Sequence, residues 1–133
     1  MYILKTESFG GFIKYSFSNP QSANSFSIVP AMGATVLSVQ IGGVSIIDGC
    51  QTFDELEENN WFKSSILFPF PNRLENGCYQ FEGTAYQFPI NEPTTNNNLH
   101  GFAKNQEFKV SDSICESGNS ATTHSSNPTT ASR

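Results

Sequence analysis

The sequence has 133 residues, which is long enough for one domain with its own core and too short for two. Seven basic and twelve acidic residues give a formal net charge of -5, which excludes nucleic-acid binding through clustered Lys and Arg. No apolar run approaches the roughly 18 residues that cross a bilayer, and the residues after Met1 lack a signal-peptide pattern. The sequence therefore predicts a cytoplasmic protein without a membrane or nucleic-acid partner.

The aromatic residues divide the chain into two parts. All of them lie between Tyr2 and Phe108, whereas the remainder of the chain is rich in Ser, Thr and Asn. A segment that lacks aromatic residues and is rich in Ser, Thr and Asn buries little apolar surface to offset the loss of conformational entropy. We therefore predict a body over residues 1–110 and a polar, irregular tail, disordered or truncated, over residues 111–133.

The first half of the chain is a series of short, β-prone segments bounded by turn residues. They cover residues 2–5, 12–17, 25–29, 32–41 and 44–48. Gly10-Gly11 and Gly42-Gly43 predict two hairpin turns. The hairpin at Gly42-Gly43 is the strongest in the sequence, because apolar and polar residues alternate before the turn and a β-branched segment follows it.

The second half continues the β pattern after one helical turn. Asp54–Glu58 is the helical turn, and residues 64–68 are a buried strand or the approach to one. Tyr79/Phe81 and Tyr86/Phe88 are spaced by two on either side of Gly83-Thr84, which predicts a hairpin with an aromatic face. Residues 107–110 begin another strand. Eight or nine short strands and one helical turn are typical of an all-β, antiparallel sandwich or barrel.

Neither the acidic turn nor the cysteines favour a metal site. Acidic residues in the first turn of a helix complement its dipole, so Asp54–Glu58 is better explained as a solvated surface helix than as a cation site. Cys50, Cys78 and Cys115 are an odd number without CxxC spacing, which predicts reduced, part-buried thiols rather than a disulfide framework and supports zinc only weakly.

Asn72-Arg73 follows Phe70-Pro71, where proline geometry stiffens an extended backbone. An arginine held there presents a rigid fork of donors suited to vicinal hydroxyls or a carboxylate. The alternative is a structural arginine that pairs with Glu75 or Glu82. Spacing alone favours this alternative slightly.

His100 lies in a tight turn between three asparagines and Gly101. A histidine near neutral pKa can donate to, or accept from, a substrate hydroxyl or ring oxygen, although most single histidines are surface or satisfied core residues. Trp61, Phe68 and Phe70 have rings that can stack on a sugar, but aromatic residues of an all-β body more often belong to its core.

Three motifs in the middle of the chain occur in the order found in one known family. They are Leu67-Phe68-Pro69-Phe70-Pro71-Asn72-Arg73, then Gly77-Cys78-Tyr79-Gln80-Phe81-Glu82-Gly83 with Tyr86, then Asn98-Leu99-His100-Gly101-Phe102. Upstream, Gly33-Ala34-Thr35-Val36-Leu37-Ser38-Val39 and the Asp48-Gly49 turn fit the same series. The ordered set resembles the aldose 1-epimerase, or galactose mutarotase, family over about residues 10–110.

The resemblance implies an antiparallel β-sandwich of the galactose mutarotase-like type, incomplete in this chain, that binds an aldohexose such as glucose or galactose. It implies an isomerase of carbohydrate metabolism that interconverts α and β anomers without a metal or other cofactor. By position, Arg73 is similar to the family's sugar-binding arginine, and His100 to its first active-site histidine, a catalytic and substrate-binding residue. Asn72 adjoins Arg73 and is expected to hold it or to contact the sugar.

Two groups that the family uses are missing from this sequence. The family's general acid is a second histidine in a His-Pro-Tyr-Phe-type segment, and its general base is a late glutamate; His124 precedes Ser125-Ser126-Asn127-Pro128 and is assigned no role. We therefore expect little or no mutarotase activity from this chain alone.

The alternatives to an active aldose 1-epimerase are a non-catalytic carbohydrate-binding module and an inactive fragment. An incomplete sandwich has unpaired strand edges, which predicts self-association. A phosphosugar substrate would need more basic residues near Arg73 than Lys63 alone.

Overall fold

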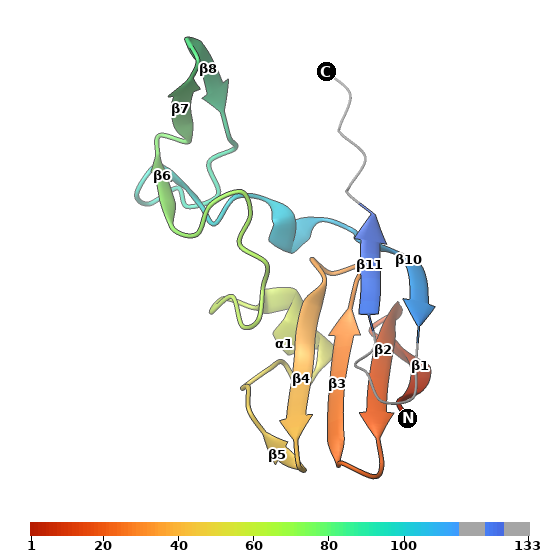
Figure 1. The fold of residues 1–133 in the computed structure, drawn as a ribbon. Helices are drawn as coiled ribbons and strands as arrows, with labels where there is room; N and C mark the ends of the chain where they lie inside the picture. The colour runs from red at the N-terminus through yellow and green to blue at the C-terminus, as the bar shows by residue number, and fades with distance from the viewer. Residues whose placement is uncertain (115–121, 127–133) are drawn as a thin grey trace. The chain divides into compact units, whose positions relative to one another are not determined.

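The computed structural model describes residues 1–114 and 122–126, and its contacts divide the chain into two compact units. The first unit comprises Met1–Ser65 and Asn105–Arg133, and the second comprises Ile66–Lys104. The described residues form eleven strands, one short α-helix and one 3-10 turn (Figure 1). All pairs of named strands are antiparallel, which confirms the predicted all-β, antiparallel class.

The first unit is built on a five-stranded meander in which each strand pairs with the next one along the chain (Figure 1). The strands are β1 (Ile3–Phe9), β2 (Phe12–Asn19), β3 (Asn24–Val29), β4 (Thr35–Ile41) and β5 (Val44–Ser45). Gly10 has a φ of 60°, and an added Cβ would lie 1.9 Å from the Phe53 ring, so this turn requires glycine. Both predicted glycine turns are confirmed as hairpins, β1–β2 and β4–β5, but β5 has only two residues instead of the five of the predicted segment 44–48.

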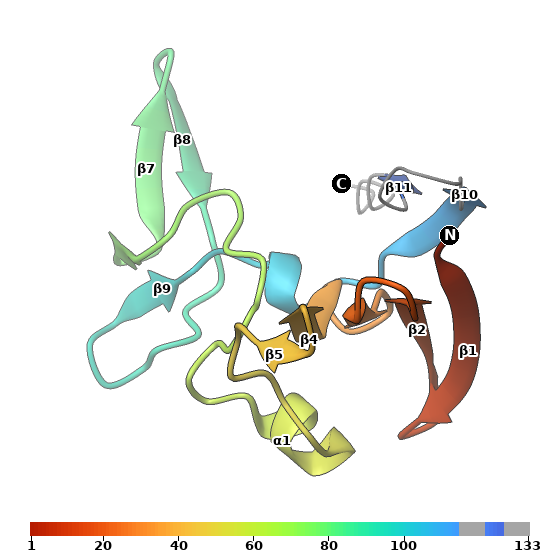
Figure 2. The same cartoon turned by 60° about the horizontal axis from the view of Figure 1, so that its bottom comes forward.

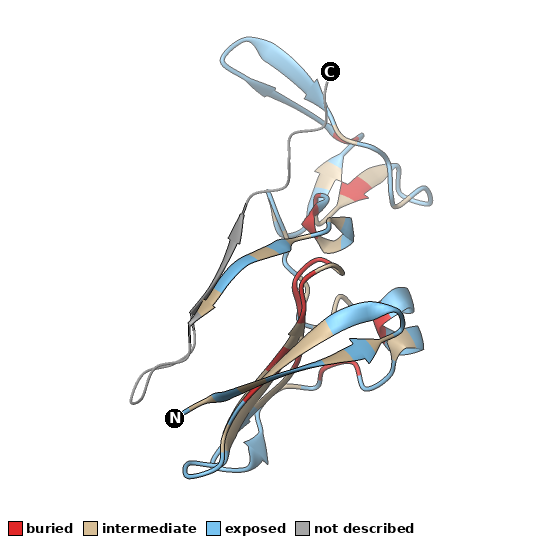
Figure 3. Ribbon diagram, turned by 90° about the vertical axis from the view of Figure 1, so that its right-hand side faces the viewer, coloured by how far each residue is buried: buried red, intermediate tan, exposed pale blue. Residues whose placement is uncertain are grey.

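The core of the first unit lies under one face of this meander. Val29, Leu37, Cys50 and Leu56 form the buried cluster, and Phe9 and Met32 pack against it. Figure 3 shows the buried residues gathered along β3 and β4. Burial of a Val or Leu side chain stabilises the fold by about 1.5–3 kcal/mol. Phe17 of β2, which is fully buried and stacked on Phe26 at 4.5 Å, adds to the apolar burial within the sheet.

The helix α1 (Phe53–Glu58) confirms the predicted helical turn. Thr52 is its N-cap, and the Thr52 hydroxyl accepts a hydrogen bond from the Glu55 N–H at 3.2 Å. The Glu55 carboxylate in turn accepts from the Gln51 N–H at 2.7 Å, which satisfies a second backbone donor before the helix.

Among the described residues there is no cluster of His, Cys, Asp and Glu that could hold a metal ion. No helix in the same part of the chain is long and apolar enough to span a membrane.

The segment after residue 105 returns to the turn between β3 and β4. The Gly33 N–H donates to the Gln106 carbonyl at 2.9 Å, and the Phe108 N–H donates to the Pro30 carbonyl at 3.1 Å. The chain then forms β10 (Lys109–Ile114), which pairs with β11 (Thr122–Ser126). The predicted boundary after residue 110 therefore falls inside β10, and β11 lies where an irregular tail was predicted. The division into a body and a tail stays a prediction.

The second unit contains two small antiparallel pairs. β6 (Arg73–Glu75) pairs with β9 (Asn97–Leu99), and β7 (Cys78–Phe81) pairs with β8 (Thr84–Gln87) (Figure 2). The 3-10 turn η1 (Ala103–Asn105) follows. The β7–β8 pair is the predicted aromatic hairpin, with the Tyr79 and Tyr86 rings stacked at 5.0 Å. The β6–β9 pair was not predicted, because each of its strands has only three residues.

Three details differ from the expectations. Residues 64–68 form no strand, and only Phe68 makes an isolated β-bridge, to Gly101. Trp61 and Phe68 are 86% and 56% exposed, so they do not belong to a core. Cys50 is buried and Cys78 is exposed, both as free thiols, and Cys115 lies outside the described residues.

Candidate functional site

The β6–β9 pair brings the predicted site residues together within the second unit. Arg73 is the first residue of β6 and is paired with Leu99, the last residue of β9. Because the strands run in opposite directions, Asn72 and His100 face each other just beyond the end of the ladder. Residues separated by 28 positions in the sequence thus become neighbours.

Asn72 and His100 exchange two hydrogen bonds. The His100 N–H donates to the Asn72 carbonyl at 2.9 Å, and the Asn72 N–H donates to His100 Nδ1 at 2.9 Å. Both residues have positive φ values, 112° and 63°, a conformation that Asn and His adopt more readily than most residues. Since Nδ1 is an acceptor, the neutral imidazole carries its proton on Nε2 and can donate only there.

Gly101 and Asn98 fix the turn that carries His100. A Cβ on Gly101, whose φ is 69°, would lie 2.1 Å from the Phe68 carbonyl oxygen, so no other residue fits this approach. The Asn98 side chain is 2% exposed; its amide donates to the Pro89 carbonyl at 2.7 Å, and its oxygen accepts from the Gly101 N–H at 3.1 Å. The backbone around His100 is therefore held from two sides.

Arg73 makes a bidentate ion pair, but its partner is Glu92. Arg73 Nε donates to Glu92 Oε2 at 2.7 Å and Nη2 donates to Oε1 at 2.6 Å. The alternative prediction of a structural arginine is therefore correct in that Arg73 forms an ion pair, but the predicted partners, Glu75 and Glu82, are wrong. The hydrogen bonds from Arg73, followed by that from Thr95, lower the pKa of Glu92 to about 2. Glu92 is charged throughout the neutral range and holds the guanidinium in one orientation.

Neighbouring polar residues hold Glu92 in turn. The Thr95 hydroxyl donates to Oε2, and the Asn97 side-chain amide approaches the same oxygen at 3.5 Å. The Glu92 side chain is only 18% exposed, whereas that of Arg73 is 51% exposed. The arginine therefore presents its remaining N–H groups to solvent from a fixed base.

Asn91 fixes the backbone on the edge of β9 with its side chain. Its side-chain oxygen accepts from the Leu99 N–H at 2.6 Å, and its amide donates to the Leu99 carbonyl at 2.9 Å. The amide thus replaces a neighbouring strand immediately before His100. The sequence reasoning missed Asn91 and Glu92, and no local motif marks either one, because their partners lie 8 and 19 residues away.

The surroundings keep His100 neutral. Burial is the main cause that lowers the pKa of His100 from the ordinary 6.5, followed by the positive charge of Arg73. Glu92 raises the pKa to a smaller extent than Arg73 lowers it, and Lys104 lowers it slightly further. Near pH 7 the ring is therefore a neutral donor through Nε2. Together with the exposed N–H groups of Arg73, it offers hydrogen-bond donors to a ligand with acceptor oxygens.

The family model for aldose 1-epimerase matches residues 14–131. The chain belongs to the aldose 1-epimerase family. This match includes all three candidate residues, Asn72, Arg73 and His100.

Two solved structures resemble this aldose 1-epimerase family member. A galactose mutarotase-like protein from Clostridium acetobutylicum superposes with a TM-score of 0.74 and 26% identity, over 86% of this chain and 35% of that one. Galactose 1-epimerase from Lactobacillus acidophilus NCFM gives a TM-score of 0.64 at 18% identity, over 86% and 36%, and supports the fold alone. The chain thus spans about a third of the length of these solved relatives.

A curated relative shares a shorter region with this family member. The uncharacterized protein YihR from Escherichia coli (strain K12) is 40% identical over 47 residues, which is 35% of this chain and 15% of the relative. The sequence identity to YihR is higher than the identity to either solved structure, but it extends over a much smaller part of the chain.

Proposed function

We propose that the chain binds an aldohexose, such as glucose or galactose, through Arg73 and His100, as the sugar-binding part of an aldose 1-epimerase site. The observation that carries this proposal is the reciprocal hydrogen bonding of Asn72 and His100 beside the Arg73–Glu92 ion pair. It holds two sets of donors in fixed positions, which lowers the entropy lost when a ligand with several hydroxyl oxygens binds.

The ligand proposed for Arg73 is neutral. Glu92 already balances the guanidinium charge with a bidentate contact, so a second carboxylate or phosphate would meet an ion pair instead of a free cation. Hydroxyl and ring oxygens need a donor but no net charge. A neutral aldohexose therefore suits the site better than a phosphosugar.

Anomer interconversion is proposed as the reaction that this site serves. A base must take the proton from the anomeric hydroxyl while an acid protonates the ring oxygen, and each such group contributes about 10²–10⁴-fold. His100 fits the role of a donor to a sugar oxygen. Glu92 is a poor base, because its pKa is about 2 and Arg73 occupies both of its oxygens.

Sugar binding without turnover is the second candidate. It is favoured by the same finding, since Glu92, the carboxylate that contacts Arg73, has a pKa of about 2 and both of its oxygens are occupied, so it is a poor base. A cytoplasmic location and self-association through strand edges stay predictions of the sequence.

Two measurements on the full chain test the proposal. Amide NMR titration with glucose and galactose should shift the Gly101 resonance, next to His100, and the affinity read from this shift should weaken at least about tenfold in Arg73→Ala and in His100→Ala. Polarimetry of freshly dissolved α-glucose should show a rate close to buffer. Hexose binding that is unchanged in both variants would overturn the proposed site. A mutarotation rate well above that of buffer, lost in His100→Ala, would rule out sugar binding without turnover.

A further inference from the structure

The loop between α1 and residue 65 is built around a buried asparagine. Asn59 is 5% exposed; its side-chain oxygen accepts from the Lys63 N–H at 2.8 Å, and its amide donates to the Lys63 carbonyl at 3.2 Å and to the Ser65 hydroxyl at 3.0 Å. Two backbone hydrogen bonds, from Phe62 to Asn59 and from Ser65 to Phe62, close the same loop. This network fixes the loop although it belongs to no strand or helix.

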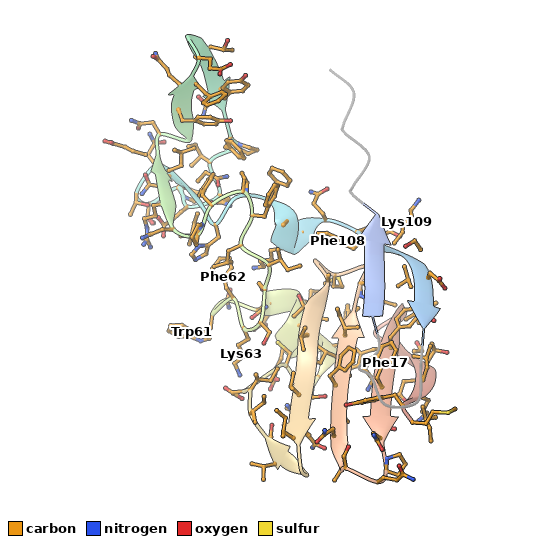
Figure 4. All side chains as sticks on the ribbon, viewed as in Figure 1. Phe17, Trp61, Phe62, Lys63, Phe108 and Lys109 are labelled. Atoms are coloured by element: carbon orange, nitrogen blue, oxygen red, sulfur yellow. The ribbon has the colours of Figure 1, made fainter. Side chains whose placement is uncertain are left out.

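The loop also contains unfavourable backbone conformations. Asn59, Phe62 and Ser64 have φ values of 23°, 54° and 51°. A left-handed conformation costs a residue other than glycine about 1–2 kcal/mol, so three of them within six residues need a compensating role. The side chain that this arrangement presents is Trp61, which is 86% exposed and projects outward from the loop (Figure 4).

A cavity of about 190 Å³ lies beside Trp61, within the first unit. Its lining includes the polar side chains of Glu58, Asn60 and Lys63, and the buried Cys50. The volume is below the about 300–1,000 Å³ of pockets for drug-sized ligands, which limits the occupant to something of the size of one small ring.

We propose that this cavity binds a single sugar ring, with one face of the ring stacked on Trp61 and its hydroxyls bonded to Glu58, Asn60 and Lys63. The apolar C–H face of a pyranose packs on an indole, and the hydroxyls on its edge match alternating acceptors and donors. The proposal does not depend on the role of Arg73 and His100, because none of the residues that it uses belongs to the second unit.

The acidic residues around the cavity disfavour anionic ligands. Glu55 and Glu58 line it and Asp48 pairs with Lys63 at 3.0 Å, so a phosphate or carboxylate ligand would meet negative charge. Because Asp48 pairs with Lys63, the charge of Lys63 does not exclude a cation stacked on Trp61, and a cation is the alternative occupant that the titration below tests. A neutral sugar is the proposed occupant because its hydroxyls match the acceptor oxygens of Glu58 and the donors of Asn60 and Lys63.

The chain offers its own reporter, because Trp61 is the one tryptophan in the sequence. Titration of the full chain with glucose or galactose should change the tryptophan emission saturably, with a dissociation constant on the order of 1 mM. Tetramethylammonium chloride, the cationic probe, should leave the emission unchanged. No saturable response to either hexose, or a response to tetramethylammonium alone, would overturn the proposal.

Variants separate this site from the one at Arg73. The emission change should persist in Arg73→Ala, and its loss there would overturn the proposal, since Trp61 would then report on the other site. Glu58→Gln should weaken the response at least about tenfold, because it removes a charged acceptor. Glu57→Gln is the matched control: it removes the same charge from an exposed neighbour that does not line the cavity, and it should leave the response unchanged.

A second readout covers binding that leaves the emission unaltered. In the Arg73→Ala background, saturation-transfer NMR should still detect the hexose. The signal should disappear when Trp61→Ala is added and remain when Trp61→Phe is added, because phenylalanine keeps an aromatic face. A signal that survives Trp61→Ala, or no signal in the Arg73→Ala background, would overturn the proposal.

Discussion

Asn72 and His100 are joined by two hydrogen bonds of 2.9 Å, one between backbone groups and one from the Asn72 N–H to the imidazole. The second bond decides the chemistry of the ring, because it occupies Nδ1 and leaves Nε2–H as the donor. It also makes His100 a structural link between the ends of β6 and β9. Stability and ligand binding should therefore respond differently to different substitutions at this position.

His100→Asn should preserve the link but lose the N–H donor at the position of Nε2, because the shorter amide cannot reach it. The asparagine oxygen can take the place of Nδ1, and asparagine tolerates the φ of 63°, whereas alanine does neither. We expect His100→Asn to be about 1 kcal/mol more stable than His100→Ala in urea denaturation, with hexose binding weakened in both. Equal stability of the two variants would contradict the structural role of the Nδ1 contact.

Arg73→Lys should impair the site although it keeps the charge. Lysine cannot reproduce the two parallel hydrogen bonds to Glu92, so the cation loses its fixed orientation. We expect weaker hexose binding and a Glu92 pKa above its present value of about 2, with a further rise toward the ordinary 4.5 in Arg73→Met. Carboxyl-detected NMR titration measures this pKa. A Glu92 pKa that stays near 2 in Arg73→Met would assign its shift to Thr95 and Asn97 alone.

Gly101→Ala should be among the most destabilising single substitutions in the second unit. Its Cβ would lie 2.1 Å from the Phe68 carbonyl oxygen, a backbone atom that cannot move by itself. Gly83→Ala is the matched control, with a similar φ of 76° but no atom within 4 Å. Both lose about 1–2 kcal/mol to the left-handed conformation, and we expect about 1–3 kcal/mol more for Gly101→Ala in denaturant unfolding.

Asn98→Ala should destabilise the turn below His100 by about 2 kcal/mol or more. It leaves the Pro89 carbonyl and the Gly101 N–H without their partner at a position that is 2% exposed. Asn98→Asp keeps the acceptor for Gly101 but turns an oxygen toward Pro89. Loss of hexose binding at a temperature where Asn98→Ala is still folded would show that this asparagine also positions His100.

The pH dependence of stability should show the depressed pKa of His100. The unfolded chain takes up a proton near the ordinary value of 6.5, whereas the folded chain does so only at lower pH. The free energy of unfolding therefore decreases as the pH falls below about 6.5, and it stops decreasing once the pH is below the pKa of His100 in the folded state. Above about pH 6.5 the ring is neutral in both states, so His100 causes no further change in stability. Denaturation of the wild type between pH 5 and 8 should show this slope, and His100→Asn should lack it.

Much of the fold could be predicted from residues that are close in sequence. Glycine pairs and alternating side chains predicted the β1–β2 and β4–β5 hairpins, and the spacing of Tyr79 and Tyr86 predicted the β7–β8 pair. These elements depend on local conformational preference and on a period of two, which the sequence displays directly. The β6–β9 pair depends on contacts across more than twenty residues and has no such signal.

The candidate site divides in the same way. The sequence alone predicted Asn72, Arg73 and His100 as site residues and determined that proline restricts the backbone before Asn72, while Gly101 permits a close approach after His100. Only the tertiary structure decided that Glu92, and not Glu75 or Glu82, binds Arg73, and that the Asn72 N–H fixes the tautomer of His100. Which partner a charged side chain or an imidazole nitrogen reaches depends on distances between distant segments, and those are set when β6 and β9 pair.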